Sequence, residues 1–144
     1  MKGNFLHVSG EPSYAIPIEN ALEGVLGFEY ESASSDHARG RFVVEEKHKQ
    51  PFGIVHGGVY AAFAEGLCSS ATYLNVRGDG KVAVGSSNFT SFLRPVTHGV
   101  VTADARPLHR GRTTWVWECE FTNEDGKRCA ASRVTLAVID PPTG

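Results

Sequence analysis

The feature that most constrains the fold is a continuous, largely apolar segment near the middle of the chain, VYAAFAEGLCSSATYLNV at 59–76. It contains no proline, is rich in alanine and repeats its apolar residues every three or four positions, which predicts one long helix that is apolar over most of its surface. Gly66 in its middle costs about 1 kcal/mol of helix propensity, which indicates close packing against a neighbour. Gly78 and Gly80 predict where the helix ends. The apolar surface of such a helix must be buried against other secondary-structure elements.

Segments rich in β-branched and aromatic residues surround this helix and predict a sheet to cover it. Before the helix, residues 29–44 read as a hairpin; after it, four strands are expected at 81–96, 100–112, 113–123 and 128–139. Strands joined by short turns form antiparallel sheets, so an α+β domain with one helix on one sheet face is predicted. An open sheet leaves edge strands that need cover, and dimerisation is a common remedy.

Length and composition narrow the function classes. The 144 residues suit one domain, expected at 24–140 after a lead-in at 1–23 and before a tail at 141–144. A net charge of −2 disfavours nucleic acid and anionic membranes as partners, and no apolar run approaches the roughly 20 residues of a membrane span. The first residues lack the apolar core of a signal peptide. We therefore expect a cytoplasmic protein whose three widely spaced cysteines are small packing residues in a reduced interior.

Candidate site residues gather at the start of the helix. Gly57 and Gly58 precede it directly, where backbone N–H groups are unpaired and an approaching carbonyl oxygen can be stabilised. Glu65 lies in the apolar stretch, where partial burial would make it a stronger base or nucleophile, and Ser69 follows one turn later. Taken singly, the glycine pair also fits a simple turn, Glu65 fits a solvated helix edge, and Ser69 fits a small packing position.

The spacing of Gly57 and Glu65 carries a geometric consequence. Eight residues of helix span about 12 Å at 1.5 Å per residue, too far for both groups to act on one ester or thioester carbon. If both act on one substrate, they belong to different chains, and two antiparallel helices would place Gly57 of one beside Glu65 of the other. The site would then occur twice in a homodimer, related by two-fold symmetry.

Three segments and one nearby residue resemble a known family: HGGVYAAFAE at 56–65, GSSNFTSFLRPV at 85–96, HRGRTTWVWE at 109–118, and Gln50. They resemble the hot-dog-fold acyl-CoA thioesterases, and most of all the Glu-dependent 4-hydroxybenzoyl-CoA thioesterases and their phenylacetate-pathway relatives. The resemblance implies an antiparallel sheet wrapped around a central helix. It also implies hydrolysis of an acyl-CoA, with an aromatic acyl group favoured, by a homodimer or homotetramer.

The resemblance also assigns roles. Glu65 corresponds to the family's catalytic acid, Gly57 N–H to the oxyanion donor and Gln50 to the residue that orients the thioester or the water. His56 matches the histidine of the signature, and Ser69 replaces a threonine one turn after the acid, keeping the hydroxyl.

The resemblance further implies that coenzyme A binds at Arg94, Arg112 and Thr113. Arg112 stands where the family has a serine and adds a cation suited to phosphate. No metal or separate cofactor is expected, since the histidines show no ligand spacing with acids or cysteines. Four aromatic residues are candidates to line the acyl pocket, although core packing is equally compatible with their spacing: Tyr60, Phe63, Phe89 and Phe92.

Several alternatives stay open at this stage. Glu65 either attacks the thioester carbon to give a mixed anhydride or deprotonates a water molecule. The same fold also hosts hydratases and dehydratases, in which His56 would be the base, and proteins that bind acyl-CoA without reacting.

Overall fold

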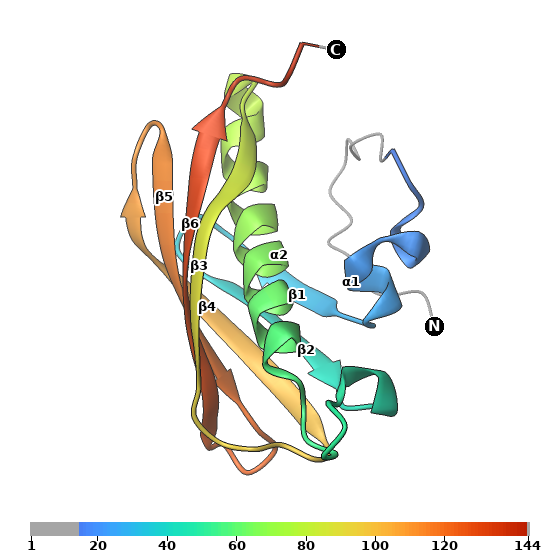
Figure 1. Ribbon diagram of the computed structural model, residues 1–144. Helices are drawn as coiled ribbons and strands as arrows, with labels where there is room; N and C mark the ends of the chain where they lie inside the picture. Colours follow the sequence, from blue (N-terminus) through green and yellow to red (C-terminus); the bar gives the residue numbers. More distant parts are fainter. Residues whose placement is uncertain (1–14, 144) are drawn as a thin grey trace.

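The computed structural model describes residues 15–143 and contains one six-stranded antiparallel sheet with one long helix (Figure 1). Along the chain the sheet comprises β1 (Glu29–Ala33), β2 (Ala38–Val43), β3 (Val82–Phe92), β4 (Val100–Arg110), β5 (Thr114–Thr122) and β6 (Arg128–Ile139). The strand order across the sheet is β1-β2-β4-β5-β6-β3, so β1 and β3 form its two edges. The predicted α+β architecture and its six strands are confirmed.

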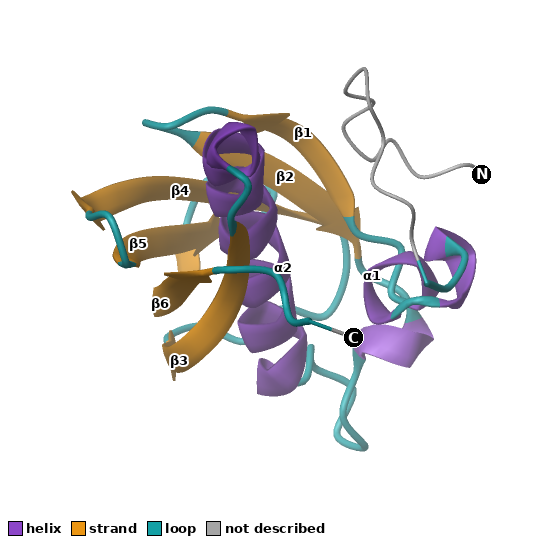
Figure 2. Cartoon of the chain, turned by 90° about the horizontal axis from the view of Figure 1, so that it is seen from above, coloured by secondary structure: helices purple, strands orange, loops and turns teal. Residues whose placement is uncertain are grey.

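The long helix α2 (Gly57–Val76) lies in the concave side of the curved sheet, as the view from above shows (Figure 2). Its apolar side chains meet those of the strands. In β5 the alternating residues Trp115, Trp117 and Cys119 are buried, and the Trp117 indole N–H donates to Thr72 Oγ1 on α2 at 2.9 Å. This alternation is what a strand with one buried face requires. All three cysteines are free and buried, as predicted.

Gly66 is in close contact with a neighbouring strand, as its position in the helix predicted. A Cβ at this residue would lie 2.1 Å from the hydroxyl of Tyr30 on β1 and 3.2 Å from a carboxylate oxygen of Glu23. Glu23 belongs to the short helix α1 (Leu22–Val25), which follows a 3-10 turn at Ile18–Asn20. The missing side chain therefore makes room for a tyrosine and a carboxylate against the helix.

The structure corrects two predicted boundaries. The helix begins at Gly57 and not at residue 59, because His56 caps it and both glycines adopt its first turn. The strand expected at 81–96 ends at Phe92, since Leu93 and Arg94 both donate to Cys129 O and Pro95 has no N–H to offer a neighbour. Residues 1–14 of the expected lead-in and Gly144 of the expected tail lie outside the described residues.

Candidate functional site

The first turn of α2 leaves one backbone donor open. The side chain of His56 accepts a hydrogen bond from Gly58 N–H at 2.8 Å, and His56 O accepts from Val59 N–H at 3.0 Å. For Gly57 N–H, the first donor of the helix, residues 15–143 provide no hydrogen-bond acceptor. The open amide is therefore the one at Gly57, at the end of the helix that carries partial positive charge.

An aromatic ring lies beside the residue that carries this amide. The ring of Phe92, the last residue of β3, occupies the space beside Gly57, where a Cβ would lie 2.5 Å from its Cζ. The same ring is 6.5 Å from that of Tyr60, centre to centre. Tyr60 and Phe63 themselves belong to the buried core, so they do not open onto a substrate pocket in the single chain.

Gln50 is held close to the helix start by a tight loop. Its side-chain oxygen accepts from Phe52 N–H, while its backbone carbonyl accepts from Gly53 N–H at 2.9 Å. Gly53 has φ of 87°, a left-handed conformation that favours glycine. The chain then leads into the helix, and the loop is closed by the His56 N–H, which donates to His48 O at 2.8 Å. The loop that carries Gln50 is thus tied through His48 to His56, the residue before Gly57.

Glu65 is exposed on α2, two turns beyond Gly57. Its carboxylate lies beside Gly85 of β3, where an added Cβ would be 3.0 Å from Oε1. Burial raises the pKa of Tyr30 well above its ordinary value, and the charges of Glu23 and Glu65 raise it further. Ser69 is half-buried one turn later, and no hydrogen bond joins it to Glu65 within the described chain. Glu65 therefore stands at an exposed position of the helix, and its carboxylate has no hydrogen-bond partner within residues 15–143.

Three successive contacts fix α2 against β3. Gly57 touches Phe92, Ala61 O accepts from the Asn88 side chain at 2.9 Å, and Glu65 lies beside Gly85. Residues four apart in a helix share one side, so Gly57, Ala61 and Glu65 all lie on the side of α2 that borders β3. The sequence put forward Phe92 as a candidate for the acyl pocket, but it did not predict these three contacts, since a sequence pattern does not reveal which strand borders a helix.

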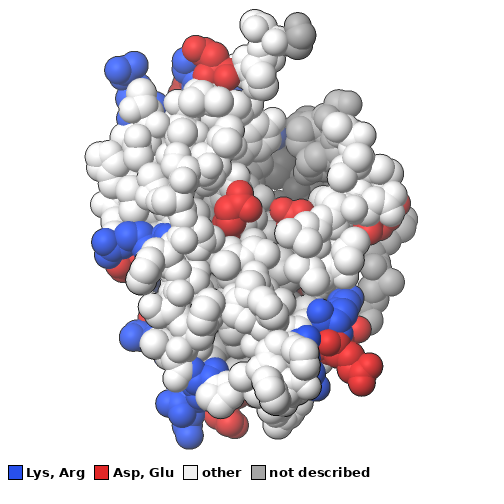
Figure 3. Space-filling model, in the orientation of Figure 1, with Lys and Arg blue, Asp and Glu red and all other residues white. Residues whose placement is uncertain are grey.

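This side of the molecule is open. Strand β3 pairs with β6 on one side, and its other side pairs with no strand in the described chain. The middle of the face over α2 and β3 carries no Lys or Arg and only a few acidic atoms, while the basic side chains lie at its margin (Figure 3). Strand β3 has eleven residues and none of them is charged, and an edge strand of this kind readily pairs with another chain.

Within one protomer, the residues predicted to bind coenzyme A lie near opposite ends of strand β6. Arg94 N–H donates to Cys129 O at the start of β6, whereas Thr113 O accepts from Val138 N–H near its end. These two positions on β6 are about 30 Å apart at roughly 3.3 Å per residue. Arg94, Arg112 and Thr113 are all exposed, and one chain does not bring them together.

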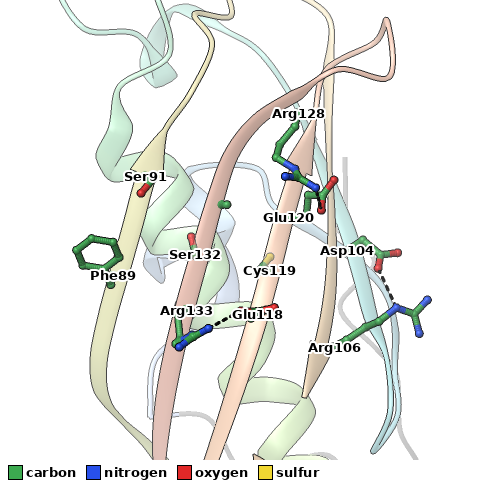
Figure 4. Close-up of a pocket in the computed structure, with 11 residues that line it drawn as sticks. Phe89, Ser91, Asp104, Arg106, Glu118, Cys119, Glu120, Arg128, Ser132 and Arg133 are labelled. Atoms are coloured by element: carbon green, nitrogen blue, oxygen red, sulfur yellow. Dashed lines mark hydrogen bonds and ion pairs between the residues drawn. The ribbon is translucent and has the colours of Figure 1, made fainter. Parts of the chain in front are cut away.

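A separate open pocket of about 800 Å³ lies on the sheet face that points away from α2 (Figure 4). Ion pairs cross it, with Arg133 to Glu118 at 2.6 Å and Arg128 to Glu120 at 2.7 Å. Its acidic and basic side chains neutralise one another. Of the residues that the sequence put forward, Phe89 alone lines it, so this candidate for the acyl pocket lies on the face away from Gly57 and Glu65. Exposed ion pairs of this kind contribute little to stability and mark no chemistry by themselves.

The described residues contain neither a metal-binding cluster nor a membrane-spanning helix. Within residues 15–143, no three His, Cys, Asp or Glu side chains gather closely enough to hold a metal ion. No helix in that range is both long and apolar enough to cross a membrane.

Comparisons with known proteins identify relatives along most of the chain. The model of the Thioesterase superfamily matches residues 52–130. The proofreading thioesterase EntH of Cronobacter turicensis is 41% identical over 133 residues, covering 92% of this chain and 96% of that protein. A crystal structure of a thioesterase from Haemophilus influenzae is 39% identical, with a TM-score of 0.79 and 84% of each chain covered. A mutant thioesterase from Pseudomonas aeruginosa is 36% identical, with a TM-score of 0.80, and covers 84% of this chain and 87% of its own.

Proposed function

The chain belongs to the thioesterase superfamily, and we propose that it hydrolyses an acyl-CoA thioester at two equivalent sites, each shared by two copies of the chain. Its antiparallel sheet around α2 is the hot-dog fold of these thioesterases, as the sequence resemblance predicted. Thioesterase chemistry requires a donor for the carbonyl oxygen and a carboxylate or activated water for the carbonyl carbon. Gly57 N–H and Glu65 are the groups proposed for these two tasks.

One observation supports the shared site above all others. Gly57 and Glu65 lie on one continuous helix about 12 Å apart and both face the open side that β3 borders. A second copy, turned by a two-fold axis near Ala61 and Asn88, would set Glu65 of the partner subunit opposite Gly57. The unpaired edge of β3 would pair with its own copy across the same axis, which also removes the exposed edge.

The proposed reaction begins with the thioester carbonyl oxygen on Gly57 N–H. In the nucleophilic route, a Glu65 carboxylate oxygen attacks the carbonyl carbon, the C–S bond breaks, and the thiolate leaves and takes up a proton. Water then hydrolyses the mixed anhydride to the free acid and restores Glu65. In the general-base route, Glu65 takes a proton from water as the water oxygen attacks, and this proton passes to the leaving thiolate.

The surrounding residues have supporting roles in this proposal. Gln50, on its loop beside the helix start, orients the thioester or the water, and Ser69 holds a water molecule near Glu65. His56 caps the helix and thereby leaves Gly57 N–H as its open donor. His56 Nδ1 is occupied by the Gly58 amide, which supports a positioning role for this histidine.

Coenzyme A is proposed to bind across the two protomers. The two-fold axis that reverses β3 would bring Arg112 and Thr113 of one chain toward Arg94 of the other, so that cations from both chains meet the phosphates. An aromatic acyl group, a homotetramer made of two such dimers and a cytoplasmic location complete the proposal. No separate cofactor is required, because coenzyme A enters as part of the substrate.

The test is a substitution that keeps the shape of the carboxylate and removes its charge. Glu65→Gln is expected to lower kcat for an aryl-CoA thioester by about 10²–10⁴-fold, with an unchanged melting temperature because Glu65 is exposed. Glu31→Gln is the matched control, since Glu31 on β1 only forms exposed ion pairs with Arg39 and Arg41. Near-normal turnover by the Glu65 variant would refute the assignment. Single turnover in ¹⁸O-labelled water separates the two routes, because only the anhydride route carries label into Glu65.

A further inference from the structure

Phe92 is placed differently from the other exposed aromatic residue of its strand. It is 61% exposed, yet its ring rests against Gly57 on the helix side of the sheet. Phe89, three residues earlier on β3, is 75% exposed and lines the pocket on the opposite face (Figure 4). The same strand thus directs one phenyl ring toward the proposed site and one away from it.

We propose that Phe92 is a positioning residue for the thioester, and this inference rests on the proposed function. Its ring lies beside Gly57, whose N–H has no acceptor within residues 15–143. A carbonyl oxygen bound at Gly57 N–H would therefore have an apolar wall on one side, from which water is excluded. A hydrogen bond to a developing oxyanion is strengthened when water is excluded around it. The ring should act mainly in the transition state, where charge on that oxygen is greatest.

The contact also explains why residue 57 has no side chain. Gly57 does not have a positive φ, so its backbone would accept alanine without strain. A Cβ there would lie 2.5–2.8 Å from three carbons of the Phe92 ring, and the ring would have to move. Gly57→Ala and Phe92→Ala therefore share one consequence, the loss of the wall beside the amide. Their effects on kcat should not add.

The experiment measures kcat and KM for benzoyl-CoA in the full-length protein, at concentrations where each variant sediments like the wild type. Phe92→Ala is expected to lower kcat about tenfold, a part of the roughly 10²-fold that a 1 Å misplacement can cost, with KM changed less than about twofold. Phe92→Leu should restore most of the rate because it rebuilds an apolar wall. Phe89→Ala is the matched control and should retain the wild-type rate.

The double variant provides the sharper result. Gly57→Ala combined with Phe92→Ala should be no slower than Gly57→Ala alone, whereas independent effects would multiply. An unchanged kcat in Phe92→Ala, a leucine variant as slow as alanine, or multiplying effects would each overturn the inference. Failure of the proposed function looks different, because the wild type would then release no thiol or would tolerate Glu65→Gln.

Discussion

Replacing Gly66 by alanine tests how closely the helix is packed behind the proposed site. The new Cβ would lie 2.1 Å from the Tyr30 hydroxyl, whereas ordinary contacts begin near 3.4 Å, so the two atoms must separate by about 1.3 Å. Tyr30 is only 3% exposed and its ring packs edge-on against Phe63 at 5.4 Å, which restricts its movement. Overpacking of this kind costs about 1–3 kcal/mol.

Alanine also gains about 1 kcal/mol of helix propensity over glycine, which offsets part of this cost. Gly78→Ala is the matched control, because a Cβ there meets no atom within 4 Å and the residue lies in the helical turn Arg77–Asp79. Urea unfolding at equal protomer concentration should place the Gly66 variant about 1–3 kcal/mol below the Gly78 variant. The difference should shrink when Tyr30→Phe removes the hydroxyl from the wild-type and Gly66 variant backgrounds alike. Equal stabilities for the two alanine variants would refute the packing proposed for Gly66.

Two other properties follow from the site and the core. Arg94→Ala and Arg112→Ala should each raise KM for an acyl-CoA about tenfold, because charge-assisted hydrogen bonds to phosphate are lost. KM for an acyl-pantetheine, which lacks the nucleotide phosphates, should not change. An equal rise in KM for both substrates would contradict phosphate binding. Burial raises the pKa of the Cys68 and Cys129 thiols, so the unfolded chain loses these protons first as the pH rises. The free energy of unfolding, measured by urea titration at pH 7 and pH 9.5, should therefore fall above about pH 8.5, and a value that holds or rises would contradict this linkage.

Most of the fold could be predicted from local patterns. The apolar segment at 59–76 matched a buried helix, and alternation such as Trp115, Trp117, Cys119 matched a strand with one buried face. The ends of helices and strands were harder to predict, because they depend on hydrogen bonds between segments that are distant in the sequence. The end of β3 at Phe92, for example, reflects the hydrogen bonds of Leu93 and Arg94 to Cys129. The sequence also did not predict that β3 lies at the edge of the sheet beside β6, since no local signal specifies strand order.

The candidate site was predicted in part. Gly57 and Glu65 stood out because glycines expose the backbone N–H groups at a helix start and because an acid inside an apolar helix is uncommon. The contacts that position them were missed: Phe92 on Gly57, Asn88 on Ala61 and Gly85 beside Glu65. Each contact joins a helix residue to a strand residue twenty or more positions away, and the relative register of the two elements is set only by tertiary packing.

The central claim is that Glu65 acts on a thioester held by the partner subunit's Gly57, and mixed dimers test it most directly. Glu65→Gln and Gly57→Val each disable both sites of their own homodimer. If the two groups come from different chains, unfolding and refolding an equimolar mixture should restore about a quarter of the wild-type activity, because half of the dimers would be mixed and each would contain one intact site. If both groups come from the same chain, every site carries a substitution, and the mixture would remain as inactive as the two separate variants.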